Sequence, residues 1–297
     1  MSGIHVASHH AMNTWWQVRI AGEEEAYAAQ AAQAAFAITD RMESLMSRFR
    51  DDSEVSALAA LPTGGRRRLS REVFDCLALA AEVQKATEGA FHVCATEGRP
   101  EIASPRWHLD HATVEFVADS APCVIDLGAI AKGFSLDRMA EELHVWGIKR
   151  FLLMSSGSSI LAGDAPDGQE GWAVRLGDGA GSRELPLCRR ALGTSGFDMR
   201  GRHIIDPSTG NPASRYRRSW ALAPTAAEAD ALSTAWMNME REKIERLCAR
   251  SDGMVAACLL DLSGFGNMHG VGFEPTTPSV SGRCATTAPT VRKLSEN

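Results

Sequence analysis

The sequence predicts an α+β fold. Segments with strand-like and helix-like patterns alternate irregularly along the chain, which favours an α+β arrangement over a doubly wound parallel sheet. The chain has 297 residues, of which 44% are hydrophobic and 23% charged. This is the composition of a globular protein with room for one large domain or two small ones. No internal repeat is visible.

The first third of the chain predicts one strand and two helices. Residues 14–20 read TWWQVRI, an alternating run rich in β-forming side chains. Residues 23–49 follow the helical period, and a second helix is expected from Ser70, as its N-cap, to Gly89. The apolar positions of the first helix recur on one stripe, formed by Ile38, Met42, Leu45, Met46 and Phe49.

The remaining elements are predicted from shorter signals. Residues 123–147 indicate a strand, a glycine turn and a helix. Thr225 and Glu228 form a T-x-x-E capping box, which predicts a helix over residues 226–240. Residues 263–297 are rich in Pro, Ser, Thr and Gly with little apolar periodicity, so we expect a disordered tail. Further strands are expected near residues 151–154, 172–176, 185–191, 219–223 and 254–260.

Charge, apolar runs and cysteines exclude several classes of function. The net charge of −6 offers no electrostatic footprint for nucleic acid. No run approaches 18 consecutive apolar residues, so no membrane span is expected. The first residues show neither a signal peptide nor a lipobox. The seven cysteines are scattered, without a C-x-x-C pair. These observations favour a cytoplasmic protein with reduced thiols.

Residues 125–133, I-D-L-G-A-I-A-K-G, could bind an anionic ligand. Asp126 ends an apolar run, small residues follow, and Lys132 lies on the predicted helix. A turn of small residues lets a ligand approach the backbone, and the N–H groups at a helix start suit an anion. A plain strand-to-helix turn explains the segment equally well. It is not a Walker A loop, because the lysine precedes the second glycine.

Two other segments carry oxygen and nitrogen donors at suggestive positions. If the capping box sets the helix start, Asp230, Ser233 and Thr234 lie at i, i+3 and i+4 on one face. Three oxygen donors there could bind a hard cation such as Mg²⁺. From spacing alone, a solvated polar helix face is the better explanation. His203 follows the hydroxyl-rich turn at residues 194–196 and is a weak candidate for a base.

Taken together, seven segments in order resemble the ApbE-type FAD:protein FMN transferases. The resemblance covers residues 12–262, which would form one ApbE-like flavin transferase domain. Its motifs are AMNTWW (11–16), MSRFRDDSE (46–54), GAFHV (89–93), DLGAIAKGFSLD (126–137), TSG (194–196), HIIDPSTG (203–210) and APTAAEADALST (223–234).

The resemblance implies a reaction and a set of partners. Members of the family split FAD, attach its FMN half to a threonine hydroxyl of a target protein and release AMP, with Mg²⁺ as the usual ion. The fold implied is ApbE-like, with mixed or antiparallel sheets packed with helices. This chain has no S-G-A-T stretch of the kind such enzymes modify, so the acceptor threonine is expected on another protein.

The resemblance also implies roles for particular residues. His203 matches a histidine that could act as general base. The metal positions match Ala129, through its backbone carbonyl, together with Asp230, Ser233 and Thr234. The positions that contact FAD match Met12, Phe49, Ala90, Phe91, His92, Asp126, Lys132 and Ile205. Phe49 stands where a tyrosine often stacks on the flavin, and stacking survives loss of the hydroxyl.

This sequence departs from the family pattern at three places. The usual F-D-x-T reads Phe91-His92-Val93-Cys94 here, a G-G-D turn reads Gly157-Ser158-Ser159, and Ser233 stands where some members have a second carboxylate. The last change implies a weaker metal site. Two alternatives to transfer are a non-catalytic FAD-binding protein and an FAD pyrophosphatase that gives FMN and AMP.

Overall fold

A mixed α+β architecture is present, as predicted. The computed structural model describes residues 3–95, 106–177, 182–197, 203–261 and 268–271. Its main sheet has eight strands, and all neighbouring strands are antiparallel. Their order across the sheet is β1 (Ile4–Ala11), β2 (Thr14–Ala21), β6 (Phe151–Ser155), β7 (Ser159–Ala162), β10 (Arg190–Gly196), β13 (Tyr216–Ala223), β14 (Ala256–Asp261) and β15 (Met268–Val271).

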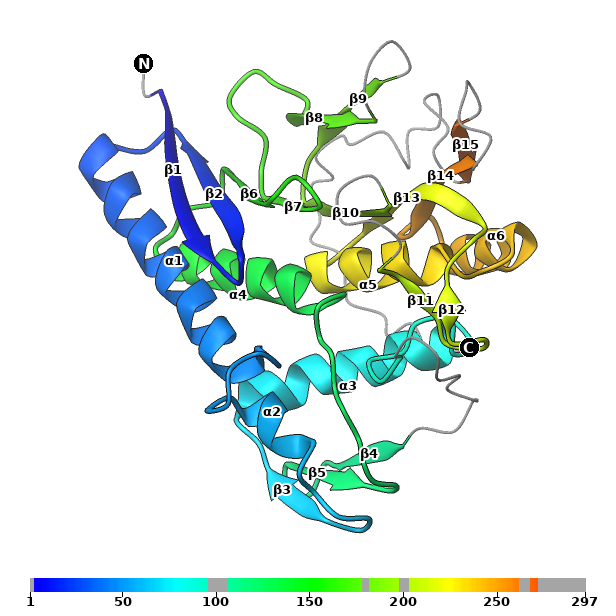
Figure 1. The fold of residues 1–297 in the computed structure, drawn as a ribbon. Helices are drawn as coiled ribbons and strands as arrows, with labels where there is room; N and C mark the ends of the chain where they lie inside the picture. The colour runs from blue at the N-terminus through cyan, green and yellow to red at the C-terminus, as the bar shows by residue number, and fades with distance from the viewer. Residues whose placement is uncertain (1–2, 96–105, 178–181, 198–202, 262–267, 272–297) are drawn as a thin grey trace.

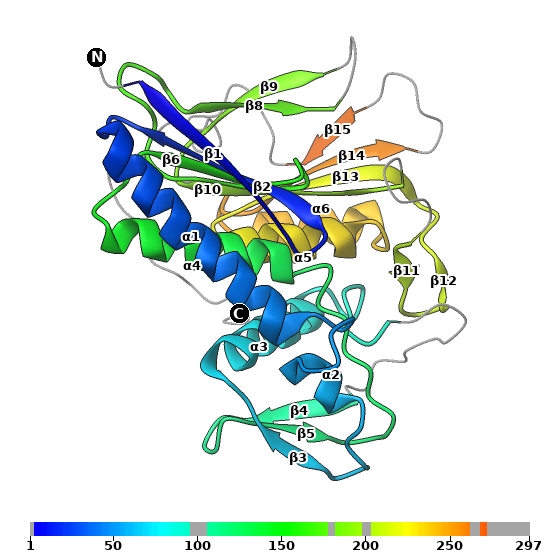
Figure 2. The ribbon, with the colours of Figure 1, turned by 60° about the vertical axis from the view of Figure 1, so that its left-hand side comes forward.

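Helices cover one face of this sheet and a small hairpin lies on the other (Figures 1 and 2). The hairpin is formed by β8 (Trp172–Leu176) and β9 (Arg183–Leu187), and its apolar side chains pack in a second, smaller core. The main core lies between the sheet and the helices. The helices of this layer are α1 (Glu25–Met46), α4 (Ala131–Val145), α5 (Ala226–Trp236) and α6 (Arg241–Arg250).

A smaller lobe lies beyond the helices in Figure 2. It contains α2 (Glu54–Leu58), α3 (Arg71–Ala86) and a three-stranded sheet in the order β3 (Arg66–Arg68), β5 (Glu115–Ala118) and β4 (Trp107–Asp110). A further pair, β11 (Ile205–Asp206) and β12 (Asn211–Pro212), stands apart from the main sheet. The loops between this lobe, the helices and the main sheet surround the site described below.

Local capping signals predicted helix starts correctly. The Ser70 hydroxyl accepts from the Val73 amide (3.4 Å), and Thr225 and Glu228 form the reciprocal capping box. Gly89 has a φ of +84° and ends the turn after α3, where its amide donates to Gln84 O. Glu88 already has a φ of +53°, so the left-handed turn that closes the helix end begins one residue before the glycine.

Several predicted elements are wrong in detail. Residues 123–127 form no strand, because the Asp126 amide donates to Val93 O (2.7 Å) but no ladder of bonds to a neighbouring strand forms. The predicted strand over 185–191 is split between β9 and β10 near Arg189, whose φ is +48°. The helix predicted over residues 226–240 ends at Trp236. There, backbone hydrogen bonds between residues three apart replace the α-helical bonds between residues four apart, and α6 follows.

The ends of the chain also differ from expectation. Residues 4–11 form β1, which pairs along its whole length with β2. The prediction of a disordered tail from residue 263 is wrong for Met268–Val271, which form β15 because they pair with β14. The rest of that predicted tail lies outside the described residues. None of the helices in the described part of the chain is long and apolar enough to cross a membrane.

Candidate active site

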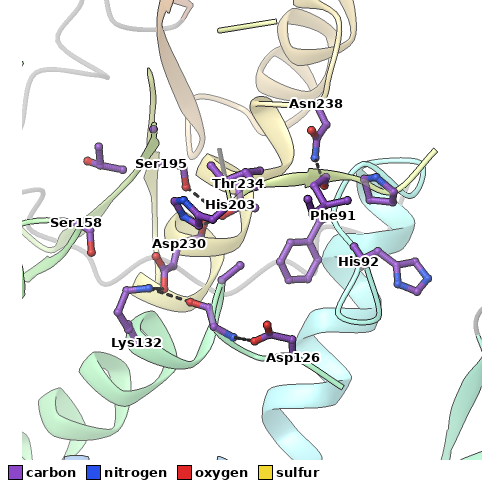
Figure 3. A pocket seen from close by; sticks show the side chains of 18 of the residues that line it. Phe91, His92, Asp126, Lys132, Ser158, Ser195, His203, Asp230, Thr234 and Asn238 are labelled. Atoms are coloured by element: carbon purple, nitrogen blue, oxygen red, sulfur yellow. Dashed lines mark hydrogen bonds and ion pairs between the residues drawn. The ribbon is translucent and has the colours of Figure 1, made fainter. Parts of the chain in front are cut away.

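One pocket of about 520 Å³ gathers most of the predicted site residues. Its size falls within the range of small-molecule sites. Figure 3 shows that its side chains come from helices, strands and loops far apart in the sequence. Of the predicted residues, those that line it are Phe49, Ala90, Phe91, His92, Asp126, Ala129, Lys132, His203, Ile205, Asp230 and Thr234.

Asp230 is a buried carboxylate at the wall of this pocket. It is 3% exposed. Its Oδ1 accepts from the Ser159 hydroxyl (2.9 Å), and its Oδ2 accepts from the Gly133 amide (3.1 Å) and lies 3.5 Å from Lys132 Nζ. A carboxylate removed from water needs such partners to keep its charge. The arrangement therefore holds one negative charge beside one cation at the pocket wall.

Direct backbone contacts fix the helix that carries Asp230. A Cβ at Gly133 on α4 would lie 2.1 Å from Ala226 O, and a Cβ at Gly193 on β10 would lie 2.1 Å from Ala229 O. Both neighbours of α5 thus approach its backbone where a side chain would not fit. Asp137 on α4 also accepts from the Ala226 and Ala227 amides at 2.8 and 2.9 Å. Burial raises the pKa of the Asp137 carboxyl to about 7, although these two amide bonds favour its charged form.

We expect Gly133→Ala to lower the free energy of unfolding by about 1–3 kcal/mol, the usual cost of overpacking. Alanine is the better helix former by about 1 kcal/mol, but its methyl group cannot coexist with a carbonyl oxygen 2.1 Å away. Urea unfolding measures the change. Gly3→Ala is the control, since nothing lies within 4 Å of a Cβ there. Equal stability of the Gly133 variant and the wild type would contradict the close approach.

The donors around Asp230 fit Mg²⁺. Among the described residues, no three His, Cys, Asp or Glu side chains gather as a complete metal site. Asp230, Thr234 and Ala129 nevertheless line one pocket and offer only oxygen atoms. Mg²⁺ prefers oxygen ligands and is usually held by one or two carboxylates together with substrate phosphates and water. The site thus fits Mg²⁺ when a phosphate-bearing ligand completes it.

Ser233 does not line the pocket. Its side chain is fully buried, and its hydroxyl donates to Asp230 O (2.8 Å) and lies 2.9 Å from Ser195 Oγ. Thr234 lines the pocket, and its hydroxyl lies 3.0 Å from the same Ser195 Oγ. Of the three oxygen donors predicted from helical spacing, the fold therefore presents only Asp230 and Thr234 to a ligand.

Lys132 and Asp126 anchor the turn that faces the pocket. Lys132 Nζ donates to Gly128 O (2.9 Å), and Asp126 Oδ1 accepts from the Gly128 amide (2.8 Å). The second carboxylate oxygen of Asp126 pairs with Arg48 Nε at 3.0 Å. Both side chains thus close the turn around a small residue, and Lys132 adds a cation that is only 19% exposed.

Phe49 is not part of the core, although its position in the apolar stripe of the first helix predicts burial there. The first helix ends at Met46, three residues earlier, and Phe49 is 81% exposed at the pocket. The guanidinium carbon of Arg48 lies 4.3 Å from the centre of its ring. An exposed ring at a pocket mouth suits stacking on a planar ligand better than packing.

We expect Phe49→Ala to weaken FAD binding by about 3–10-fold, because an aromatic stack contributes about 0.5–1.5 kcal/mol. Phe49→Tyr should keep the dissociation constant within a few-fold. Flavin fluorescence titration gives these values, and thermal melting checks the fold. Val145→Ala is a matched control at an equally exposed apolar residue, 81% exposed. A loss of melting temperature that matches the loss of affinity would indicate a packing role only.

The segment after α3 brings three predicted residues to the pocket. Ala90, Phe91 and His92 all line it, and Phe91 and His92 are 2% and 8% exposed. The Phe91 amide donates to the Thr87 hydroxyl (3.2 Å), and His92 Nδ1 accepts from the Cys94 amide (3.0 Å). The His92 ring is therefore held in place rather than free to sample rotamers.

His203 and Ile205 line the pocket from the segment that leads into β11. His203 is exposed, whereas Ile204 between them is buried. The Ala213 amide donates to Ile204 O (2.8 Å), which holds the segment against the β12 side of the hairpin. The His203 imidazole therefore lines the pocket, and the backbone next to it is held by a hydrogen bond.

Met12 is not brought to the pocket. It lies in the turn between β1 and β2 with a φ of +52°, its amide donates to Glu43 Oε2 (2.9 Å), and its sulfur accepts from the Ser135 hydroxyl. Thr14, two residues later, does line the pocket and hydrogen-bonds to Ser156. Met12 therefore joins β1 to α1 and α4 in this structure.

Sequence reasoning missed several lining residues. The resemblance implies no ligand contact for the turns at residues 156–158 and 194–196, although TSG is one of its motifs, and both turns line the pocket. Arg48, Arg218 and Asn238 also line it. Arg48 lies within the motif at residues 46–54, whereas Arg218 and Asn238 lie outside every motif, so no local pattern marks these two as site residues.

Comparisons with known proteins indicate one family. The sequence model of the ApbE family matches residues 12–259. The chain is 24% identical to a FAD:protein FMN transferase of Klebsiella pneumoniae (strain 342), over 82% of this chain and 80% of the relative. It is 26% identical to one of Haemophilus influenzae, over 81% and 82%.

Solved structures share the fold. The flavin transferase ApbE from Vibrio cholerae superposes with a TM-score of 0.79 at 18% identity, covering 95% of this chain and 100% of that one. The ApbE protein of Thermotoga maritima gives 0.75 at 20% identity, covering 90% and 96%. At these identities the likeness concerns the fold.

Proposed function

This chain belongs to the ApbE family, and from that membership we propose that it transfers the FMN half of FAD to a threonine hydroxyl of a target protein. Both curated relatives described above are FAD:protein FMN transferases. The observation that carries the proposal is the single pocket in which Asp230, Lys132 and His203 meet the predicted FAD contacts.

In the proposed reaction, the threonine oxygen attacks the phosphorus of the FMN half of FAD. A new oxygen–phosphorus bond forms, and the bond from that phosphorus to the bridging oxygen breaks. The bridging oxygen leaves with AMP. The threonine proton goes to a base on the enzyme. Because charge accumulates on the phosphoryl and leaving oxygens, catalysis needs cations and fixed donors beside them.

Asp230, Thr234 and the Ala129 carbonyl would hold Mg²⁺ on the pyrophosphate. When bound, the ion neutralises phosphate charge and polarises the phosphorus. Lys132 adds a cation at the same wall, since its ammonium lies 3.5 Å from Asp230 and 2.9 Å from Gly128 O. Asp230 is buried, so little water screens its attraction to Lys132 or to a bound Mg²⁺, and both attractions are stronger than at the surface.

His203 is the proposed general base. Its imidazole lines the pocket on the anchored segment before β11. A neutral imidazole can accept the threonine proton near pH 7 as the new bond forms. The exposure of His203 suits this role, because the acceptor must reach it from outside.

The remaining lining residues would orient FAD. Phe49 would stack on the flavin, Ala90, Phe91 and His92 would contact the nucleotide from the segment after α3, and Asp126 would do so from the turn before α4. The hydrogen bonds described above hold the Phe91 backbone, the His92 ring and the Asp126 carboxylate in place before FAD binds, which favours correct orientation of the substrate.

Incubation with FAD, Mg²⁺ and a protein that bears a candidate acceptor threonine tests this function. We expect AMP release together with covalent flavin fluorescence on the target protein, both lost with EDTA. Release of free FMN and AMP without labelling would instead show a pyrophosphatase. Tight FAD binding without either product would show a non-catalytic flavin-binding protein.

We further propose that the acceptor lies on another protein and that the enzyme works in a reducing compartment such as the cytoplasm. Cys76, Cys248 and Cys258 are buried free thiols. Burial raises the pKa of the Cys258 thiol to about 11 and that of Cys248 to about 12, which keeps both protonated and unreactive. Protein thiols persist in this state where disulfides are kept reduced.

A further inference from the structure

We propose that Asn238 is a positioning residue that joins two walls of the FAD pocket and so sets both FAD affinity and the placement of His203. This inference rests on the proposed function and concerns a residue outside every matched motif. Asn238 lies two residues beyond the end of α5 and lines the pocket (Figure 3).

The side-chain amide of Asn238 bridges two segments. Its Nδ2 donates to Ala90 O (3.1 Å) and to Ile205 O (3.2 Å). A carboxamide nitrogen carries two hydrogens, so both are used. Ala90 belongs to the segment after α3, and Ile205 is the first residue of β11. One side chain therefore sets the spacing between walls that come from residues more than a hundred positions apart.

The backbone of Asn238 is anchored as well. The residue is 9% exposed, its backbone amide donates to Ala235 O (2.9 Å), and its backbone carbonyl accepts from Arg215 Nε (3.0 Å). Its Oδ1 has no hydrogen-bond partner among the described residues. A buried, unsatisfied acceptor is unfavourable, so the residue is better explained by the two bonds that it donates than by packing.

The bridge reaches the reacting groups from both sides. Along the chain, Asn238 follows Asp230 by eight residues, so the α5 segment supplies both the proposed metal ligand and the bridge. On the other side, Ile205 follows His203 by two residues. The hydrogen bond from Asn238 to the Ile205 carbonyl therefore limits the positions that the His203 imidazole can take. Loss of the bridge is therefore expected to separate the Phe91 wall from the His203 wall.

Two variants of Asn238 test the bridge through FAD binding. Asn238→Leu keeps the approximate shape and removes both donors, and we expect the FAD dissociation constant to rise about 10-fold. Asn238→Asp directs a carboxylate at two carbonyl oxygens, so a larger rise is expected at pH 8. As the pH falls toward 5, the protonated carboxyl regains one donor, and FAD affinity should recover toward that of wild type. The leucine variant should show no such recovery.

The control makes the same chemical change at an exposed residue of β12. Asn211→Asp adds a carboxylate where the side-chain amide donates to Thr209 O (3.4 Å), and the variant should bind FAD like wild type at every pH. Flavin fluorescence gives the dissociation constants, thermal melting of the apoprotein checks the fold, and single-turnover transfer reports the placement of His203. We expect the turnover rate of bound FAD to fall in both Asn238 variants.

The outcomes separate this proposal from the proposed function. If wild type binds FAD and both Asn238 variants match it, the bridge has no positioning role and only this proposal fails. A loss of affinity in Asn238→Asp that does not recover at low pH also contradicts it, because the effect would then reflect packing. If wild type itself fails to bind FAD, the proposed function falls and this proposal falls with it.

Discussion

Asp230→Asn is expected to lower the rate of FAD cleavage by roughly 10²–10³-fold, since a bound metal contributes several kcal/mol to stabilising charge in the transition state. The substitution keeps the shape of the side chain and removes the only carboxylate among the proposed ligands. It also leaves Lys132, whose ammonium lies 3.5 Å away, without its counter-charge. Mg²⁺ loses its bound water reluctantly, so neutral oxygen ligands alone would bind it weakly. Rates measured across a Mg²⁺ titration should show a higher half-saturation as well as a lower maximum.

The control for this variant is Asp167→Asn, which removes a carboxylate from a side chain that is 84% exposed. It should leave cleavage unchanged. Because the Asp230 carboxylate also accepts from Ser159 and the Gly133 amide, thermal melting must accompany the kinetics. Full FAD cleavage by a folded Asp230→Asn protein at low Mg²⁺ would contradict the assignment of Asp230 as a metal ligand.

His203→Gln should reduce transfer to a protein threonine by about 10²–10⁴-fold, the usual contribution of a positioned general base. Glutamine keeps a polar side chain but cannot accept the threonine proton at neutral pH. FAD affinity and Mg²⁺ dependence should therefore stay near wild type. The loss should ease at high pH, where hydroxide begins to substitute for the base. Single-turnover transfer with saturating FAD measures the chemical step directly.

A different result for His203 would reassign the residue. If His203→Gln loses FAD affinity while the FAD that still binds reacts at nearly the normal rate, the histidine positions the substrate and another base must be sought. Comparison with the Asn238 variants is informative here. Those variants should affect binding and turnover together, whereas His203→Gln should affect turnover alone.

Much of the fold could be predicted because its signals are local. The helix starts at Ser70 and Thr225 depend on side-chain bonds within three residues, and the structure contains both. The three-stranded sheet, β1 and β7 were missed, because short or mixed-polarity strands are defined by their partners. The same reason explains the error at residues 123–127, which are apolar except for Asp126 but pair with no neighbouring strand.

By itself, the sequence determined the family and the α+β class, and most of the site residues that it predicted line one pocket. It placed Asp230, Ser233 and Thr234 on one turn of a helix, because helical spacing is a property of the local backbone. Only the tertiary structure decided which of them lines the pocket. Asp230 and Thr234 line it and Ser233 does not, because the contacts of α5 with Gly133 and Gly193 set the rotation of that helix. The exposure of Phe49 and the bridge made by Asn238 likewise depend on packing between distant segments, which no local pattern encodes.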